Sequence, residues 1–266
     1  MCNFFFSLEK PEFQSASIKE IVDNSHWAPV DGGITNFNYQ VTLDEHSFFV
    51  QILDSHRIKQ LPTQHFVPNN QVIEKNVQLK PWLVPCLHET KELRVFEWSE
   101  GVITSANTFD QPGYQTELCD FLSILHSNIS ILPVLDINQH LEHYYQLAIK
   151  NKPDKKKEFK KHYLRAKECA KSFIPTKNCH NDLSPGNILI SQNSTDKKLQ
   201  IVDWEYACIS DPFFDLAGVC VNFEFSDQQQ QNLIQNYSEN MAIYPNMNKF
   251  NKMKELYQLI NLLWCA

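Results

Sequence analysis

The sequence predicts an α+β fold of two lobes, an N-terminal antiparallel sheet with one helix followed by a mostly helical C-terminal lobe. Short apolar runs typical of strands occupy the first part of the chain. In the second part, apolar residues recur three and four positions apart, as on one face of a helix. The change falls near 97–101, so we divide the chain into lobes of 1–97 and 98–266.

Strand signals occur in four segments, and polar turns separate the members of each pair: 39–43, 47–53, 83–87 and 93–98. Between the two pairs, Asn69 and Asn70 can cap a helix that runs to about Leu79. Pro81 then ends it, because proline has no amide hydrogen for a helix interior. The first lobe is therefore expected to be a sheet with one helix laid on it.

Helical periodicity marks four segments of the second lobe: 118–125, 141–148, 159–170 and 256–263. One β hairpin interrupts them, with strands at 187–190 and 199–203 around a polar turn. A ligand site is expected between two such lobes, since clefts of this kind are favoured binding places.

Composition excludes several classes of protein. The net charge of −7 and the absence of a basic stripe argue against nucleic-acid binding, and Lys155–Lys157 with Lys160 and Lys161 are spaced like a solvated helix face. No run of eighteen apolar residues is present, and no basic residue precedes the Phe4–Phe6 cluster. The eight cysteines form no C-x-x-C pair, which argues against zinc. We expect a cytoplasmic protein with no membrane partner, and the sequence does not fix its oligomeric state.

Carboxylate and amide side chains gather around the hairpin of the second lobe. Asp182 precedes Asn187 by five residues on a loop that enters the first strand, and Asp203 ends the second strand. Strand pairing would bring Asn187 beside Asp203, and Mg²⁺ prefers such hard oxygen ligands. A carboxylate at Asp182 can accept the proton of a hydroxyl. Each residue alone is common in turns, but the three together favour phosphoryl transfer to an alcohol.

These residues also carry a family resemblance. His180-x-Asp182-x-x-x-x-Asn187 followed by Asp203 resembles the aminoglycoside phosphotransferase and choline kinase superfamily, whose fold is protein-kinase-like. Asp203-Trp-Glu-Tyr-Ala207 and Asp211-Pro-x-x-Asp215 are similar to its bacterial choline kinase and thiamine kinase branch. The resemblance covers nearly the whole chain and is most specific at the central motif. It implies ATP and Mg²⁺ as cofactors, with a nucleotide and a small-molecule alcohol as partners.

The resemblance assigns roles to individual residues of the second lobe. Asp182 would be the catalytic base, and Asn187 and Asp203 would hold Mg²⁺. His180 and Asp215 would support the catalytic loop rather than react.

The resemblance places the nucleotide on the first lobe. Its phosphates would meet the backbone and side chains of one loop: Gly32, Gly33, Thr35, Asn36 and Asn38. Glu97 and Trp98 would form the hinge beside adenine. Gln51 stands where the family usually has a Lys or Arg, so Arg57 or Lys59 could substitute, and Glu74 could lack its usual partner. A nucleotide-binding pseudokinase therefore remains an alternative.

The acceptor is expected to be a small cation with a hydroxyl. Four residues are candidates for its site: Glu205, Tyr206, Tyr257 and Trp264. A carboxylate and aromatic faces suit a quaternary ammonium group. Tyr257 and Trp264 share a helix with apolar Ile260 and Leu263, which favours a core role for them, so Glu205 is the better candidate. Choline or a related amino alcohol comes first, then thiamine, then an aminoglycoside or sugar.

Overall fold

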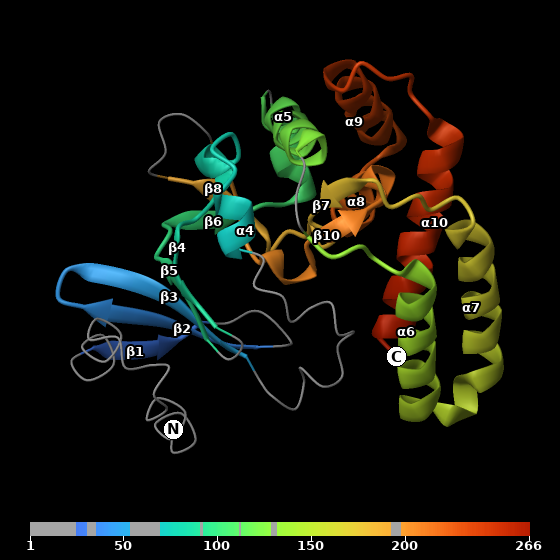
Figure 1. Ribbon diagram of the computed structural model, residues 1–266, viewed down its shortest axis with the longest axis horizontal. Coiled ribbons are helices and arrows are strands. Elements are labelled where there is room, and N and C mark those ends of the chain that lie inside the picture. Colours follow the sequence, from blue (N-terminus) through green and yellow to red (C-terminus); the bar gives the residue numbers. More distant parts are fainter. Residues whose placement is uncertain are drawn as a thin grey trace. The chain divides into compact units, whose positions relative to one another are not determined.

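The computed structural model describes residues 25–30, 36–53, 70–90, 93–111, 113–128, 132–192 and 198–266. Two compact units make up the chain, and their elements are labelled in Figure 1. Among the described residues, the first unit takes in 25–53 and 85–99, with the gaps given above. The second takes in 70–84 and everything from 100 onward.

The first unit is a five-stranded antiparallel sheet in the order β1-β2-β3-β5-β4. Its strands are β1 His26–Pro29, β2 Asn36–Leu43, β3 His46–Leu53, β4 Cys86–Glu89 and β5 Leu93–Glu97. The β2–β3 ladder runs from Asn36 opposite Leu53 to Leu43 opposite His46, and Asp44 in the turn has a positive φ of 52°. This confirms the predicted hairpin.

The two faces of this sheet differ in character. Residues directly opposite one another on neighbouring strands share a face, and successive residues alternate between faces. One face carries the small apolar core, which consists of Val41, Val50, Leu93 and Val95 with Trp27, Tyr39, Phe48 and Ile52 packed against it. The other face carries a row of polar residues at directly opposed positions, Asn38, Gln51, Arg94 and Glu89.

The second unit is mostly helical and holds the larger core. Its main helices are α5 Tyr114–Ser127, α6 Ile137–Asn151, α7 Lys156–Ala170, α8 Pro212–Asn222, α9 Asp227–Asn240 and α10 Met247–Trp264. Helix α10 packs against α6, α7 and α8, and α5 packs against α9. Four of these helices confirm the periodic segments of the sequence. Helix α8 was not predicted, and eight successive residues of it, Phe213 to Cys220, are buried.

Short strands within the second unit frame one loop. Strand β7 (Lys177–Cys179) pairs with β10 (Cys208–Ser210), and β8 (Ile188–Ser191) lies between β6 (Gly101–Ile103) and β9 (Leu199–Ile201). The β8–β9 pair confirms the predicted hairpin. The loop that joins β7 to β8 contains Asp182 and Asn187, so both of its ends are fixed by strand pairing.

The segment between the two strand pairs differs from the prediction. Helix α4 spans only Asn70–Glu74, and a short 3₁₀ turn at Lys80–Trp82 follows. Asn76 accepts a hydrogen bond from the backbone N–H of Gln78 at 3.0 Å, a local bond that competes with helix continuation. Trp82 is buried in the core of the second unit, so the structure groups this segment with the helices and not with the sheet.

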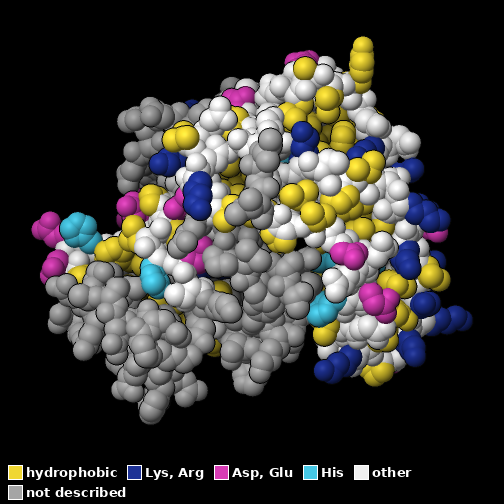
Figure 2. Space-filling view, viewed as in Figure 1, with side chains coloured by type: hydrophobic (Ala, Val, Ile, Leu, Met, Phe, Trp, Pro, Cys, Tyr) yellow, Lys and Arg dark blue, Asp and Glu magenta, His cyan; other side chains and the backbone are white. Residues whose placement is uncertain are grey.

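The basic cluster of the sequence is confirmed as a solvated helix face. Lys155–Lys157, Lys160 and Lys161 are all exposed, and Figure 2 shows Lys and Arg side chains on the outer side of α6 and α7. Phe159 and Tyr163 occupy the opposite, buried side of α7. Across the helices described here, none has the length and apolar character needed to span a membrane.

Gly218 of α8 makes room for a buried aromatic ring. A Cβ at this position would lie 3.0 Å from Cε2 of Tyr257, which is held by a hydrogen bond from Asn222 to its hydroxyl and by the ring of Phe214. We expect Gly218→Ala to lower the free energy of unfolding by about 1–3 kcal/mol through overpacking, although alanine is the better helix former. Denaturant unfolding measures the change. A variant as stable as the native chain would show that the ring can move.

Candidate active site

The loop between β7 and β8 is anchored by one buried carboxylate. Asp215 of α8 is 1% exposed and accepts the backbone N–H of His180 at 2.8 Å and that of Asn181 at 2.6 Å. Asn181 has a positive φ of 66°, a conformation that a non-glycine residue holds only where its surroundings fix it. Asp215 therefore fixes the start of the loop.

Two further residues support Asp215: His126 contacts its carboxylate, and Tyr237 contacts His126. The Nε2 atom of His126 on α5 lies 3.2 Å from Oδ2 of Asp215, and its Nδ1 atom lies 2.9 Å from the hydroxyl of Tyr237 on α9. All three side chains are buried. The loop is thus connected to α5, α8 and α9 through one chain of hydrogen bonds.

His180 links the loop to the end of the β8–β9 hairpin. Its Nε2 atom lies 3.0 Å from the carbonyl oxygen of Val202, and its Nδ1 atom lies 3.3 Å from the backbone N–H of Asp182. This pair of contacts requires a neutral ring with the proton on Nε2, which donates while Nδ1 accepts. Burial lowers the pKa of His180 to about 4, although the charge of Asp215 and the bond to Val202 act in the opposite direction.

Asp182 and Asn187, which lie five residues apart on the loop, are in direct contact. The Nδ2 atom of Asn187 donates to Oδ2 and to the backbone oxygen of Asp182, each at 2.8 Å. Both partners are acceptors, so the orientation of the amide is fixed and its Oδ1 atom is turned away from Asp182. Asn187 thereby holds the carboxylate in place.

Asp203 lies beside this pair because of the strand register. Ile188 is opposite Ile201, and the N–H of Val202 donates to the carbonyl oxygen of Asn187 at 3.0 Å. Asp203 follows directly, with φ 62° and ψ 68°. A left-handed backbone at a non-glycine residue costs on the order of 1–3 kcal/mol and persists where the surroundings impose it.

Several negative and aromatic groups surround Asp182. Burial raises the pKa of Asp182 to about 6, the negative charge of Glu205 adds to this, and the hydrogen bond from Asn187 acts against it. Glu205 is 5% exposed, although it carries a carboxylate. Burial raises the pKa of Tyr206 well above its usual value, and the charges of Tyr144, Glu205, Asp182 and Asp203 add to this. Asp182, Asp203, Glu205, Tyr144 and Tyr206 therefore form one cluster whose charges act on one another.

Tyr144 and Tyr257 complete the cluster from two helices. Tyr144 of α6 shares a hydrogen bond with Tyr206, and burial followed by the charge of Asp182 raises its pKa. The same two causes, in the same order, raise the pKa of Tyr257 on α10. Asn222 of α8 donates to the hydroxyl of Tyr257 and to the carbonyl oxygen of Leu183 in the loop, both at 2.9 Å. Helices α6 and α10 thus bring aromatic groups to the loop, and α8 brings the amide of Asn222.

The structure brings most of the predicted second-lobe residues together, with one exception. Trp264 is 41% exposed at the end of α10, about 10 Å along the helix from Tyr257. The sequence did not single out Tyr144, Asn222, His126 or Tyr237. The helical spacing of apolar residues in 141–148 marked Tyr144 as a core residue. No local sequence pattern distinguishes a core residue from one that faces a site.

The predicted nucleotide residues fall in the first unit or outside the described residues. Gly32, Gly33 and Thr35, and the substitute cations Arg57 and Lys59, lie outside the described residues. Asn36 and Asn38 lie on β2 and Gln51 on β3. The N–H of Glu97 donates to Pro85 and that of Trp98 to Ser47, each at 3.1 Å. Both hinge amides are therefore used within the sheet.

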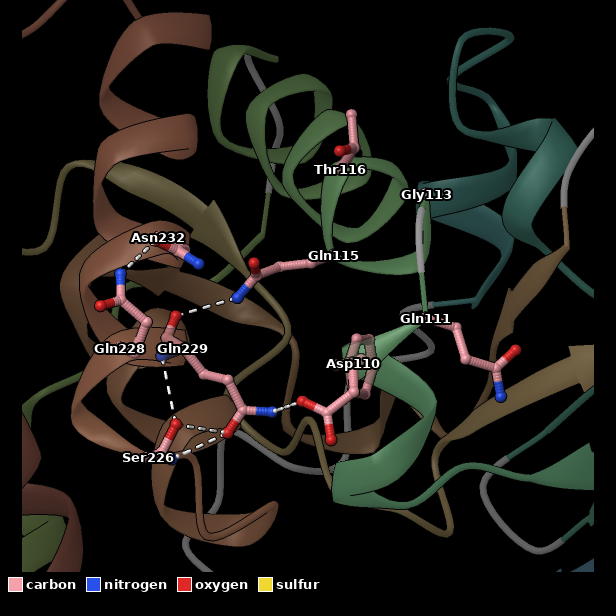
Figure 3. Close-up of a pocket in the computed structure, with 10 residues that line it drawn as sticks. Asp110, Gln111, Gly113, Gln115, Thr116, Ser226, Gln228, Gln229 and Asn232 are labelled. Carbon is pink, nitrogen blue, oxygen red and sulfur yellow. Dashed lines mark hydrogen bonds between the residues drawn. The ribbon is translucent and has the colours of Figure 1, made fainter.

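A separate surface pocket of about 400 Å³ lies between the start of α5 and the start of α9, and none of the residues above lines it. Figure 3 shows its polar lining. Gln229 donates to Asp110 at 2.7 Å, and Gln115 donates to the carbonyl oxygen of Gln229 at 2.9 Å. The amide groups of this pocket form hydrogen bonds with one another and with neighbouring backbone. These bonds link the start of α5 to the start of α9, and we assign the pocket no functional role.

The neutral, buried state of His180 predicts a dependence of stability on pH. An exposed histidine in the unfolded chain has a pKa near 6.5, whereas His180 has a pKa of about 4 in the fold. Protons therefore favour the unfolded chain as pH falls below 6.5, and the loss at pH 5 is about 2 kcal/mol. Denaturant unfolding of the native chain and of His180→Gln at pH 7 and pH 5 measures it. The contribution is absent in the variant, and equal pH dependence in both proteins would contradict the assignment.

Comparison with known proteins identifies the family. A sequence model of the phosphotransferase enzyme family matches residues 26–250, which is most of the chain. Among curated proteins, LicA of Haemophilus influenzae is 37% identical over 59 residues. That alignment covers 22% of this chain and spans only about a fifth of the relative, 21% of its length.

Solved structures with the same fold cover nearly the whole chain. Choline kinase LicA from Streptococcus pneumoniae has a TM-score of 0.78 at 19% identity, over 96% of this chain and 89% of that one. LicA in complex with AMP gives 0.72 at 19% identity, over 96% and 88%. Plasmodium vivax ethanolamine kinase gives 0.66 at 14% identity, over 96% and 82%. These likenesses confirm the predicted kinase-like fold, and the family match confirms the predicted enzyme class. With its own sequence matched over residues 26–250, the chain belongs to the phosphotransferase enzyme family.

Proposed function

We propose that the chain is an ATP- and Mg²⁺-dependent kinase that phosphorylates the hydroxyl of a small cationic molecule, choline or a related amino alcohol. The observation that carries this proposal is the loop in which Asn187 holds the carboxylate of Asp182 at 2.8 Å, next to Asp203. Phosphoryl transfer depends mainly on positioning and on neutralising charge, and this loop is built for both. The choline and ethanolamine kinases that share the fold support the choice of acceptor.

Asp182 is the proposed catalytic base. Its pKa of about 6 leaves the carboxylate ionised at neutral pH, yet more basic than an ordinary aspartate. A base with a pKa near the working pH combines the correct protonation state with useful proton affinity. The hydrogen bond from Asn187 orients the Oδ2 atom, so the other carboxylate oxygen, Oδ1, is the one we assign to the acceptor hydroxyl.

Asn187 and Asp203 are the proposed ligands of Mg²⁺, and their chemistry fits the ion. The Nδ2 atom of Asn187 donates both of its hydrogen bonds to Asp182. The amide oxygen is therefore turned away from Asp182 and is available as a neutral ligand. Asp203 supplies a carboxylate at the adjoining strand end. Hard oxygen donors in small number, completed by phosphate oxygens and water, are what Mg²⁺ prefers. When bound, the ion neutralises charge on the polyphosphate.

The nucleotide is assigned to the residues of the sheet unit. Asn36 and Asn38 on β2 offer side chains for phosphate, and we keep Gly32, Gly33 and Thr35 in the same role. The LicA structure with AMP supports nucleotide binding by this fold. Because the N–H groups of Glu97 and Trp98 are bonded within the sheet, an adenine contact there uses other backbone atoms of these two residues.

The acceptor site is assigned to Glu205, Tyr206, Tyr257 and Tyr144. Glu205 is a buried carboxylate close enough to Asp182 to raise its pKa. A buried negative charge with aromatic neighbours suits a cation that cannot donate hydrogen bonds, and each cation–π contact contributes about 0.5–2 kcal/mol. Thiamine, with a cationic ring and a primary hydroxyl, is the alternative acceptor. Trp264, exposed at the end of α10, is kept only as a peripheral contact.

The role of Asp182 can be tested by removing its carboxylate. We expect Asp182→Ala to lower kcat by about 10²–10⁴-fold because the general base is lost. Nucleotide affinity, measured by titration calorimetry, should stay within about threefold. Asp154→Ala, at an exposed site before α7, is the matched control and should retain full activity. Turnover by Asp182→Ala at the native rate would reject this base.

The acceptor class can be tested by pairing choline with its neutral carbon analogue, 3,3-dimethyl-1-butanol. ADP release is measured with both, and with ethanolamine, thiamine and aminoglycosides as a panel. We expect Glu205→Gln to raise KM for choline about tenfold and to leave KM for the neutral analogue unchanged, because only the cation meets the lost charge. Exposed Glu158→Gln is the control. Equal effects on the two alcohols would remove Glu205 from the acceptor site.

A further inference from the structure

The polar face of the sheet unit carries one buried positive charge. Arg94 of β5 is 3% exposed, and it is the only Lys or Arg among the residues of this unit that the structure describes. Its Nε atom donates to Oε1 of Glu89 at 3.0 Å, and its Nη1 atom donates to Oε1 of Gln51 at 3.1 Å. A cation, a carboxylate and an amide are thus joined in one buried group.

Strand register places this group in line with the proposed nucleotide residues. Arg94 is directly opposite Gln51 on β3 and directly opposite Glu89 on β4. Gln51 is in turn opposite Asn38 on β2. Side chains at directly opposed positions share one face of a sheet, so Asn38, Gln51, Arg94 and Glu89 form a continuous row. The row runs across four strands and begins at a residue already assigned to phosphate.

Stability alone gives little reason to keep such a row. A buried ion pair contributes little net stability, and well-packed apolar residues can often replace it without loss. The other face of the same sheet shows that alternative, because Val50 and Val95 pack together one position away from Gln51 and Arg94. Glu89 already neutralises Arg94, so the polar row as a whole, and not an unpaired charge, is what a bound ligand would explain.

We propose that Arg94 provides the positive charge that contacts the phosphates of the nucleotide, and that Gln51 and Glu89 position its guanidinium. In kinase-like folds a strand cation held by a carboxylate meets these phosphates. Here that charge has moved one strand over, from β3 to β5, and its acidic partner is Glu89. A guanidinium presents a planar fork of donors that suits phosphate oxygens. Gln51 is then an orienting residue, and its lack of charge does not make the chain a pseudokinase.

This inference rests on the proposed function, and ligands with and without phosphate separate the two. Affinities of the native chain and of Arg94→Gln are measured by titration calorimetry with MgATP and with adenosine. We expect the variant to bind MgATP about 10- to 100-fold more weakly, because a charge-assisted hydrogen bond to phosphate is lost. Its adenosine affinity should stay within about threefold. Arg165→Gln, which removes an exposed arginine of α7, is the matched control and should change neither affinity.

Two double variants guard against a purely structural effect. Glu89→Leu with Arg94→Met removes both charges of the pair, so it avoids leaving Glu89 buried alone, and it should show the same selective loss of MgATP affinity. Gln51→Lys with Arg94→Gln returns a cation to β3 and should recover part of that affinity, relative to Arg94→Gln alone.

The outcomes of these titrations distinguish the proposed kinase function from the proposed role of Arg94. A native chain that binds neither ligand refutes the proposed function. A native chain that binds MgATP, together with folded variants that lose MgATP and adenosine affinity equally or lose neither, refutes the role of Arg94 and leaves the kinase assignment intact.

Discussion

The hydrogen bonds of one buried carboxylate support the rest of the site. Asp215 accepts two consecutive backbone N–H groups, from His180 and Asn181, and so turns the chain sharply at the start of the loop. Without that anchor Asn181 would leave its left-handed conformation. Asp182 would then lose the position in which its carboxylate accepts a hydrogen bond from Asn187 at 2.8 Å. Because Asp215 is itself held by His126, the geometry of the loop depends on the packing of α5 against α9 and on α8. A short stretch of irregular backbone thereby acquires the rigidity of a helical core.

The site also places two negatively charged side chains, Asp182 and Glu205, in a buried position. Burial and the negative charge of Glu205 raise the pKa of Asp182, and the hydroxyls of Tyr144, Tyr206 and Tyr257 lie near it. Such an arrangement is costly in an empty protein, since buried carboxylates are unfavourable unless a partner compensates them. The cationic ligands proposed above would remove this penalty. The raised pKa of Asp182, a buried carboxylate held by the amide of Asn187, is therefore what marks this loop as a candidate active site.

The two faces of the sheet unit divide stability and polar character between them. One face is a small aliphatic and aromatic core, and the other holds Asn38, Gln51, Arg94 and Glu89 at successive opposed positions. A strand alternates its side chains between faces, so a single sequence such as Leu93-Arg-Val-Phe96 serves the core and the polar row at once. The core residues of one face hold the sheet together, so the residues of the polar row can take another role, which we propose to be phosphate binding.

The sequence by itself determined the order of sheet and helices, the β2–β3 and β8–β9 hairpins, and the motif that gathers Asp182, Asn187 and Asp203, because these features rest on local periodicity and on spacing of a few residues. It did not determine where α4 ends, that α8 is a helix, or that α4 packs with the helical unit, because these features depend on contacts with segments that are distant in the sequence. Only the tertiary structure placed Tyr144 and Asn222 near Asp182, His126 behind Asp215, and Arg94 against Gln51. These contacts join residues dozens of positions apart, and their meeting is decided by strand register and helix packing, which no local pattern in the chain encodes.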